Sequence, residues 1–126
     1  MAIGSALSVG LIGLKAFIIQ IQAFVSPGLP YFSIIGLPDT SLSEARERVK
    51  SACQASGAKW PETRVTVNLS PAGIPKTGTA FDLPAALGIL GAKEVIPPER
   101  INGIWAAGEL GLDARIKPVA GVLAMV

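Results

Sequence analysis

An uncharged stretch from residue 16 to residue 38 limits most strongly what this chain can fold into. A stretch of about 20 residues without charge is long enough to cross a bilayer as a helix. Two prolines and a glycine within residues 26–30, however, would interrupt such a helix. From Ile19 to Ala23, apolar residues alternate with glutamines, which is the period-two pattern of a β-strand. The stretch therefore predicts two strands joined by a turn and no membrane span.

The same periodicity predicts the elements in the rest of the chain. We expect strands at Leu7–Leu11, Phe17–Val25, Tyr31–Ile35, Arg64–Leu69, Ile104–Glu109 and Arg115–Lys117, and helices at about 40–56, at about Phe81–Ala92 and after Pro118. This order predicts an α+β fold, a two-layer sandwich in which helices cover one face of a mixed sheet. With 126 residues, we expect one domain that spans 1–126.

The composition excludes several kinds of catalytic chemistry. The sequence contains no histidine, which rules out histidine-containing zinc sites, a Ser-His-Asp triad and a Cys-His pair. Cys53 is the only cysteine, so no internal disulfide can form, and we expect it to be a buried apolar residue. A net charge of +2 is too small to indicate nucleic-acid binding by itself. Because Lys15 follows the first apolar run instead of preceding it, a secretory signal is not indicated, and we expect a cytoplasmic protein.

The segment at residues 75–84, PKTGTAFDLP, has the composition of a loop that approaches an active site. Gly73 and Gly78 have the spacing of a phosphate-binding Walker loop, in which Lys and then Ser or Thr must follow the second glycine. Here Thr79 and Ala80 follow instead, and a proline within the loop removes one backbone N–H donor. The segment therefore does not predict a nucleotide site.

The same segment resembles the catalytic segment of Lon-type serine proteases, P-K-x-G-x-S-A-G. Residues 75–78 match its start, and the position of the nucleophilic serine falls on Ala80. Residues 108–123 resemble the second Lon segment, in which a lysine is the general base, and that position falls on Leu123. Neither an alanine methyl group nor a leucine side chain can do this chemistry. The resemblance implies a Lon-like fold, of the ribosomal protein domain-2-like or GHMP superfamily, without a catalytic residue.

Three longer segments together resemble one family. They are GLPDTSLSEARERVKSACQASG at 36–57, RVTVNLSPAGIPKTGTAFDLPAALGIL at 64–90 and GELGLDARIKPVAGVL at 108–123. The chain, from about Ala6 onward, is similar to the N-terminal domain of the magnesium-chelatase-like AAA+ ATPases of the YifB/ComM type. It departs from the family at Ala114, where many members have glycine.

This resemblance implies that a magnesium-dependent AAA+ motor follows the domain in a longer protein. It also implies a homo-oligomeric ring of neighbouring subunits and a role in DNA processing, with branch migration during natural transformation in ComM-type members. It does not imply chelation of magnesium into porphyrin. Because this sequence contains no Walker A or Walker B segment, we expect ATP and magnesium to bind outside it. The apolar run at 121–126 also leads us to expect that the chain is part of a longer protein.

Charged residues are the candidates for contact with DNA or with a neighbouring subunit: Lys76, Asp82, Arg46, Arg48, Lys50 and Arg64. We expect Lys76 to be a solvated loop residue, and Asp82 to be the N-cap of the second helix or to interact with its dipole. We also expect a pair between Glu44 and Arg48 on the solvent side of the first helix, because they are four residues apart.

The basic residues near the first helix, with Lys59, would suit DNA phosphates. Nearby glutamates dilute their charge, however, which favours an ordinary solvated surface. No aromatic series is spaced for stacking on bases. We expect Trp60 and Trp105 to pack in the core or at its edge.

Three functions stay open from the sequence. The first is a non-catalytic domain that assists assembly or the handling of DNA or another substrate in an AAA+ ATPase, so that this segment itself is not an enzyme. The second is a self-contained nucleic-acid-binding module. The third is a residual peptidase that would use Thr77, Thr79 or Lys76 in place of the lost dyad.

Overall fold

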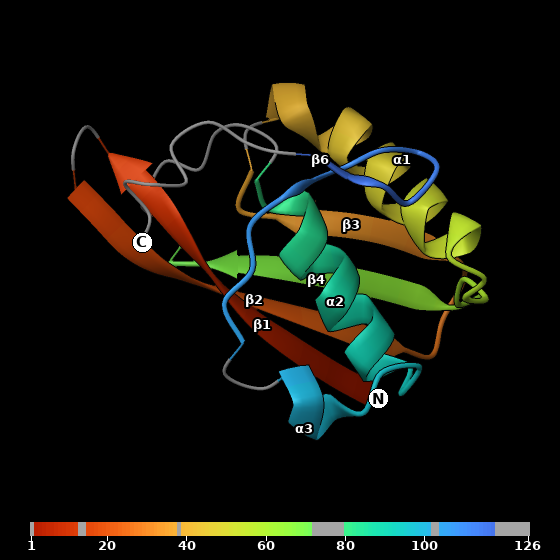
Figure 1. Cartoon of the computed structure of the whole chain (residues 1–126). Coiled ribbons are helices and arrows are strands. Elements are labelled where there is room, and N and C mark those ends of the chain that lie inside the picture. Colours follow the sequence, from red (N-terminus) through yellow and green to blue (C-terminus); the bar gives the residue numbers. More distant parts are fainter. Residues whose placement is uncertain (1, 13–14, 38, 72–79, 102–103, 118–126) are drawn as a thin grey trace.

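The core of the protein is a four-stranded sheet, seen in the computed structural model of the chain (Figure 1). The structure describes residues 2–12, 15–37, 39–71, 80–101 and 104–117. The strands are β1 (Ala2–Ile12), β2 (Lys15–Ser26), β3 (Tyr31–Ile35) and β4 (Arg64–Ser70), in the order β1-β2-β4-β3. β3 pairs with β4 in parallel, and the other two pairs are antiparallel. The predicted mixed sheet is confirmed.

The alternation of residues along β2 and β4 places the core on one face of the sheet. Ile21 pairs with Leu69, and Ala23 pairs with Val67, and all four are fully or almost fully buried. Ile18 and Gln20 point to the opposite face, where both side chains are exposed. The period-two pattern that argued against a membrane span therefore arises from a sheet with one covered face. None of the helices that the described residues form is long and apolar enough to cross a membrane; a cytoplasmic location stays a prediction.

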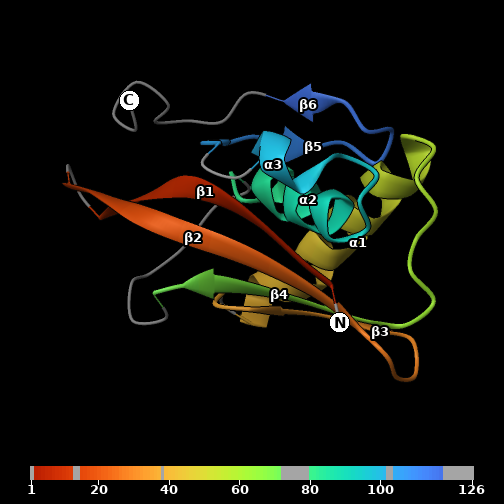
Figure 2. The ribbon, with the colours of Figure 1, turned by 90° about the horizontal axis from the view of Figure 1, so that it is seen from below.

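Two helices, α1 (Asp39–Ala55) and α2 (Asp82–Ala92), cover this face. A view turned by 90° shows them on the same side of the sheet, with the short α3 (Pro98–Ile101) beside α2 (Figure 2). α2 packs on β1 and β2, and α1 packs against α2 and β3. The two-layer α+β arrangement is therefore as predicted, and the helices expected at about 40–56 and Phe81–Ala92 lie within one residue of those bounds. The short α3 was not predicted. The Lon-like superfamily stays a prediction.

The segment after α3 differs from the prediction of a strand at Ile104–Glu109. Only Trp105 forms a bridge, to Leu7 at the free edge of β1, supported by the hydrogen bonds from Leu7 N–H to Ile104 O (3.0 Å) and from Ala106 N–H to Leu7 O (2.9 Å). The chain then leaves the sheet and crosses to the start of α2, so the apolar alternation could not continue as a strand. The predicted hairpin is present but short.

That hairpin consists of β5 (Glu109–Leu110) and β6 (Ile116–Lys117), which pair antiparallel. Its turn contains Ala114 with a φ of 72°, a left-handed conformation that favours glycine. The resemblance to the YifB/ComM type leads us to expect glycine at this position, and the left-handed backbone gives a physical reason for that expectation. The helix predicted after Pro118 lies outside the described residues.

Cys53 lies on the core side of α1, as expected, and is 3% exposed. Burial raises the pKa of its thiol to about 11. Because the thiolate is the reactive form, we expect a thiol reagent at about pH 8 to label the folded protein at least about 100-fold more slowly than the protein in denaturing urea. The labelling rate measured with and without urea tests this, and equal rates would contradict the burial of Cys53.

Candidate functional site

The start of α2 holds the position that the Lon resemblance assigns to the nucleophile. Ala80 lies directly before Phe81, the cap residue of this helix, and is 7% exposed. Its carbonyl oxygen accepts a hydrogen bond from Gly108 N–H (2.9 Å), and Leu83 N–H donates to Gly108 O (3.0 Å). These two bonds fasten the segment before β5 to the first turn of α2. At this position the chain therefore has a buried methyl group in a tightly connected backbone.

Asp82 lies in the first turn of α2, but it is not the N-cap that the sequence suggested. Phe81 is at the cap position, and no side chain caps the helix there. The Asp82 carboxylate instead accepts hydrogen bonds from Arg48 of α1, where Nη2 lies 3.2 Å from Oδ1 and Nε bonds Oδ2. Leu110 N–H also donates to Oδ2, at 3.2 Å. One buried carboxylate thus joins α1, α2 and β5.

Arg48 also corrects the prediction of a solvated surface residue. Its expected pair with Glu44 is present, with Nη1 and Oε2 3.8 Å apart. The arginine side chain is nevertheless only 19% exposed, because it turns inward to Asp82, which is 3% exposed. Arg48 and Asp82 therefore form a largely buried ion pair, and their role as contacts for DNA or a neighbouring subunit stays a prediction.

The titration of this pair reflects its burial. Burial raises the pKa of the Asp82 carboxyl above its ordinary value, although the hydrogen bonds from Arg48 and Leu110 oppose that change. The hydrogen bond to Asp82 raises the pKa of the Arg48 guanidinium. Since three donors already occupy the carboxylate, it is not available to act as a general base on a bound substrate.

The other residues of the Lon-based prediction lie outside the described residues. These are Lys76, Thr77, Thr79 and Leu123. The absence of a dyad at positions 80 and 123, the solvation of Lys76 and the residual-peptidase alternative stay predictions.

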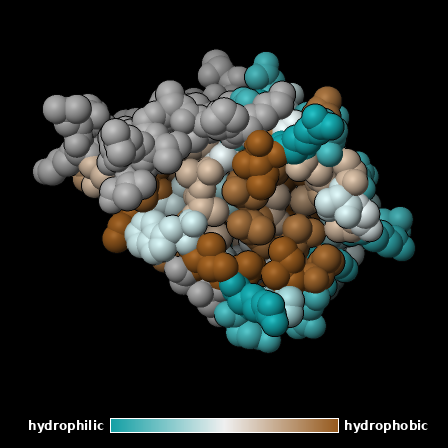
Figure 3. Space-filling view, in the orientation of Figure 1, coloured by the Kyte–Doolittle hydropathy of each residue, from teal (hydrophilic) through white to brown (hydrophobic). Residues whose placement is uncertain are grey.

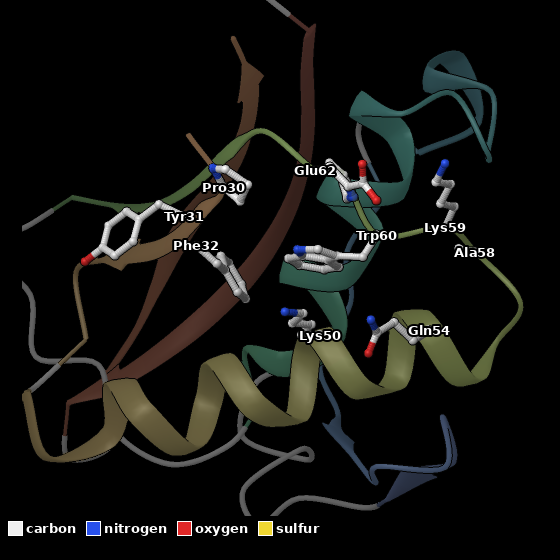
Figure 4. A pocket seen from close by; sticks show the side chains of 10 residues that line it. Pro30, Tyr31, Phe32, Lys50, Gln54, Ala58, Lys59, Trp60 and Glu62 are labelled. Carbon is white, nitrogen blue, oxygen red and sulfur yellow. The ribbon is translucent and has the colours of Figure 1, made fainter. Parts of the chain in front are cut away.

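A second site is a surface pocket between β3, the end of α1 and the segment that leads to β4 (Figure 4). Its volume is about 620 Å³. Aromatic and charged residues dominate its lining: Tyr31, Phe32, Trp60, Lys50, Lys59 and Glu62. Pro30 and Pro61 complete its rigid rim beside Tyr31 and Trp60.

Trp60 is at the centre of this pocket. Phe32 points toward it (Figure 4), with ring centroids 4.9 Å apart and ring planes tilted by 56°. Lys50 Nζ lies over the indole, 5.9 Å from the ring centroid, which is a cation–π distance. Tyr31, the neighbour of Phe32, points away from them and is 61% exposed. Trp60 packs against the core as expected, while Trp105 is 52% exposed at the edge of β1.

Several of the predicted basic residues come together here. Lys50 lines the pocket, and Arg64 pairs in register with Tyr31 at its edge. Arg46 lies one helical turn before Lys50 on α1 and is half-buried. Within the described residues, no ion pair engages these three side chains or Lys59. Glu44 pairs with Arg48, Glu47 accepts from the neutral Ser51 and keeps its charge, and Glu62 lines the pocket, so the expected dilution by glutamates stays a prediction.

The sequence missed the gathering of aromatic rings. Tyr31 and Phe32 are far from Trp60 along the chain, so no regular spacing joins them. The parallel pairing of β3 with β4 and the turn after α1 bring them together. The adjacent aromatic pair at the start of a predicted strand was the signal available in the sequence.

Comparison with known proteins identifies the family. Residues 21–126 match the family model described as subunit ChlI of Mg-chelatase. The chain belongs to this Mg-chelatase ChlI family. The resemblance to YifB and ComM, which three sequence segments indicated, is confirmed by individual relatives.

These relatives are all longer than the chain. An uncharacterized protein of Mycobacterium tuberculosis is 44% identical over 126 residues, which are 100% of this chain and 25% of the relative. The uncharacterized protein YifB of Escherichia coli is 38% identical over 112 residues, 89% of the chain and 22% of YifB. The competence protein ComM of Haemophilus influenzae is 39% identical over 111 residues, 88% of the chain and 22% of ComM. The chain thus spans about a quarter of the length of these relatives.

Proposed function

We propose that this chain is a non-catalytic N-terminal domain of an Mg-chelatase-like AAA+ ATPase, in which it assists the assembly of subunits and the handling of DNA or another substrate. ATP and magnesium would bind in a motor module that this sequence does not include. The name of the competence protein ComM supports a role of the full-length protein in competence. A part in DNA processing and a place in the cytoplasm belong to the same proposal. In this proposal the start of α2 is a Lon-like site whose nucleophile position, Ala80, is inert.

The main support for the assembly role is the apolar surface of α2. Eight of the eleven residues of α2 are buried, and all of its residues except Asp82 are apolar. The other three are half-buried leucines, Leu83, Leu87 and Leu90, spaced by about one helical turn, of which Leu83 and Leu90 also contact the core. A helix that is apolar on every side is typical of one buried within a larger structure.

The surface over α2 agrees with this interpretation. Apolar side chains gather there in the space-filling view (Figure 3). Exposed apolar surface that polar residues surround often marks a contact with another protein surface. We therefore assign the leucine side of α2 to contact with the motor module or with a neighbouring subunit.

Deletion of this domain from the full-length protein tests the proposal most directly. We expect loss of ring formation or of DNA unwinding, while the motor keeps an ATPase rate of its own. The three readouts are measured separately, by sedimentation, by a strand-displacement assay and by phosphate release. If all three were unchanged, the domain would have neither proposed role.

A point variant locates the contact. In the full-length protein, Leu87→Glu should weaken assembly at least about tenfold, because it places a charge in an apolar contact. Ile18→Glu is the matched control, since Ile18 is 62% exposed on the opposite face of the sheet. Equal effects of the two variants on sedimentation would contradict the assignment to α2.

A further inference from the structure

We propose that the pocket around Trp60 binds single-stranded nucleic acid, with a base against the indole and phosphates at the surrounding lysines. This inference rests on the proposed substrate-handling role and names the substrate class and the residues. The proposal is based on three observations: the pocket itself, its aromatic rings, and the basic side chains around it that no ion pair of the described residues engages.

The aromatic rings offer two platforms beside one edge of the sheet. β3 is the last strand in the order, so its outer edge has no neighbouring strand in the described structure. Phe32 and Trp60 lie on the helix side of β3, and the exposed ring of Tyr31 lies on the other side (Figure 4). Single strands are commonly held by successive bases stacked on aromatic side chains, because every base has a π-face.

The charges around the pocket suit a phosphate backbone. Lys50 and Lys59 line the pocket, and Arg64 lies at its edge next to Tyr31. Among the described residues, Glu62 is the one carboxylate of the lining, so the two lysines outnumber it. Lys50 covers the indole in this structure. A base that stacks on Trp60 would therefore displace the ammonium group toward its own phosphate.

The shape favours a single strand over a duplex. A base paired within a duplex is stacked between its neighbours and cannot enter a pocket, whereas an unpaired base can be splayed out onto a ring. A volume of about 620 Å³ lies in the range of pockets that hold a small organic group. Aromatic grooves also bind proline-rich peptides. Such a peptide, however, would not explain why two lysines and an arginine gather here outside any ion pair of the described residues.

Fluorescence of Trp60 provides the test. In a Trp105→Phe background, Trp60 is the only tryptophan, because the sequence contains two. We expect an oligothymidylate to quench its emission at low salt, and a duplex of equal length or a proline-rich peptide to do so at least about tenfold more weakly. The affinity for oligothymidylate should fall with salt. Tighter binding of the duplex or the peptide, or no quenching by the single strand, would overturn the proposal.

Variants connect the binding to the pocket. Trp60→Ala should weaken binding of oligothymidylate about tenfold, the loss typical of one stacked base. Because Trp60 also packs against the core, the exposed Lys59 supplies a second variant. Lys59→Glu should weaken binding and reduce the salt slope by about 0.7 or more, the contribution of one single-strand phosphate contact.

The matched control is Arg115→Glu, since Arg115 is 85% exposed on the turn between β5 and β6 and does not line the pocket. If Lys59→Glu and Arg115→Glu weakened binding equally, only the overall charge of the protein would matter. That result would overturn the proposal that the pocket is the binding site. In the full-length protein, Lys59→Glu should impair DNA binding and leave ring assembly intact. If the deletion abolished assembly but this variant changed nothing, the pocket inference would fail and the assembly role would stand.

Discussion

Replacing Arg48 by methionine is expected to lower the free energy of unfolding by about 3 kcal/mol at neutral pH. The substitution leaves the Asp82 carboxylate, 3% exposed, with only the Leu110 N–H as a hydrogen-bond donor. Breaking a buried ion pair typically costs about 3–5 kcal/mol, since the remaining charge is uncompensated. We expect the lower end because the Arg48 side chain keeps 19% of its surface exposed, so solvent screens the pair in part.

The cost should depend on pH in a defined direction. Without Arg48, nothing but the Leu110 N–H opposes the effect of burial on the pKa of Asp82, which rises further above its ordinary value. When the pKa of Asp82 is higher in the folded than in the unfolded protein, its protonated carboxyl favours folding. This contribution to the free energy of unfolding is complete below the unfolded pKa, about 3.9, and is lost as the pH rises through the folded pKa. The difference between wild type and Arg48→Met should therefore be small below about pH 3.9 and grow toward neutral pH.

Urea unfolding across this pH range measures the difference. Arg46→Met is the matched control, because Arg46 lies on the same helix and no ion pair involves it within the described residues. It should change the free energy of unfolding by less than about 0.5 kcal/mol. In the double variant Asp82→Asn and Arg48→Met, the pH-dependent part of the difference in the free energy of unfolding should be absent. A cost that stayed constant from pH 3 to pH 7 would contradict the role of the Asp82 charge.

The ion pair also shows what the sequence could predict and what it could not. The i,i+4 spacing of Glu44 and Arg48 predicted their contact, and the contact is present. Local spacing carries no information about Asp82, which is 34 residues from Arg48 along the chain. The packing of α1 against α2 brings Arg48 to Asp82, so a residue expected on the surface becomes part of the interior. Helical periodicity therefore predicted α1 but not the inward orientation of Arg48.

The strands show the same division. β2 and β4 were predictable because their alternating side chains bury one face, and this pattern is a property of the strand itself. The segment at 104–109 has apolar residues too, yet it forms a single bridge because Gly108 bonds to Ala80 at α2 instead of continuing along β1. The pocket was not predictable for a similar reason. Its residues come from β3, α1 and the segment before β4, which the parallel pairing of β3 with β4 and the turn after α1 bring together.

Gly4→Ala is expected to lower the free energy of unfolding by about 3 kcal/mol, at the upper end of the usual cost of overpacking. Gly4 lies in β1 directly beneath α2, and an added Cβ would overlap the carbonyl oxygen of Gly88 and the backbone nitrogen of Ala92. Hydrogen bonds of the helix hold both of these atoms, so neither can move alone. The whole of α2 must shift to accept one methyl group.

Gly10→Ala supplies the matched control in the same strand. There an added Cβ would meet, among the described parts of the chain, side-chain atoms of Ile19 alone, at 3.2 and 3.3 Å. A side chain can give way where a helix backbone cannot. Both substitutions restrict the unfolded chain to the same extent, so the difference between them isolates the contact with α2. We expect Gly10→Ala to cost less than about 1 kcal/mol in urea unfolding. Equal costs would show that α2 is free to move.

A double-mutant cycle connects the two predictions. If Gly4→Ala displaces α2, it also moves Asp82, which lies in the first turn of that helix, away from Arg48 on α1. Part of the ion pair is then already lost, and Arg48→Met should cost less in the Gly4→Ala background than in the wild type. A coupling of about 0.5 kcal/mol or more between residues on different elements would show that α2 moves as one body. Strict additivity would mean that the helix bends locally at Gly88 and leaves its first turn in place.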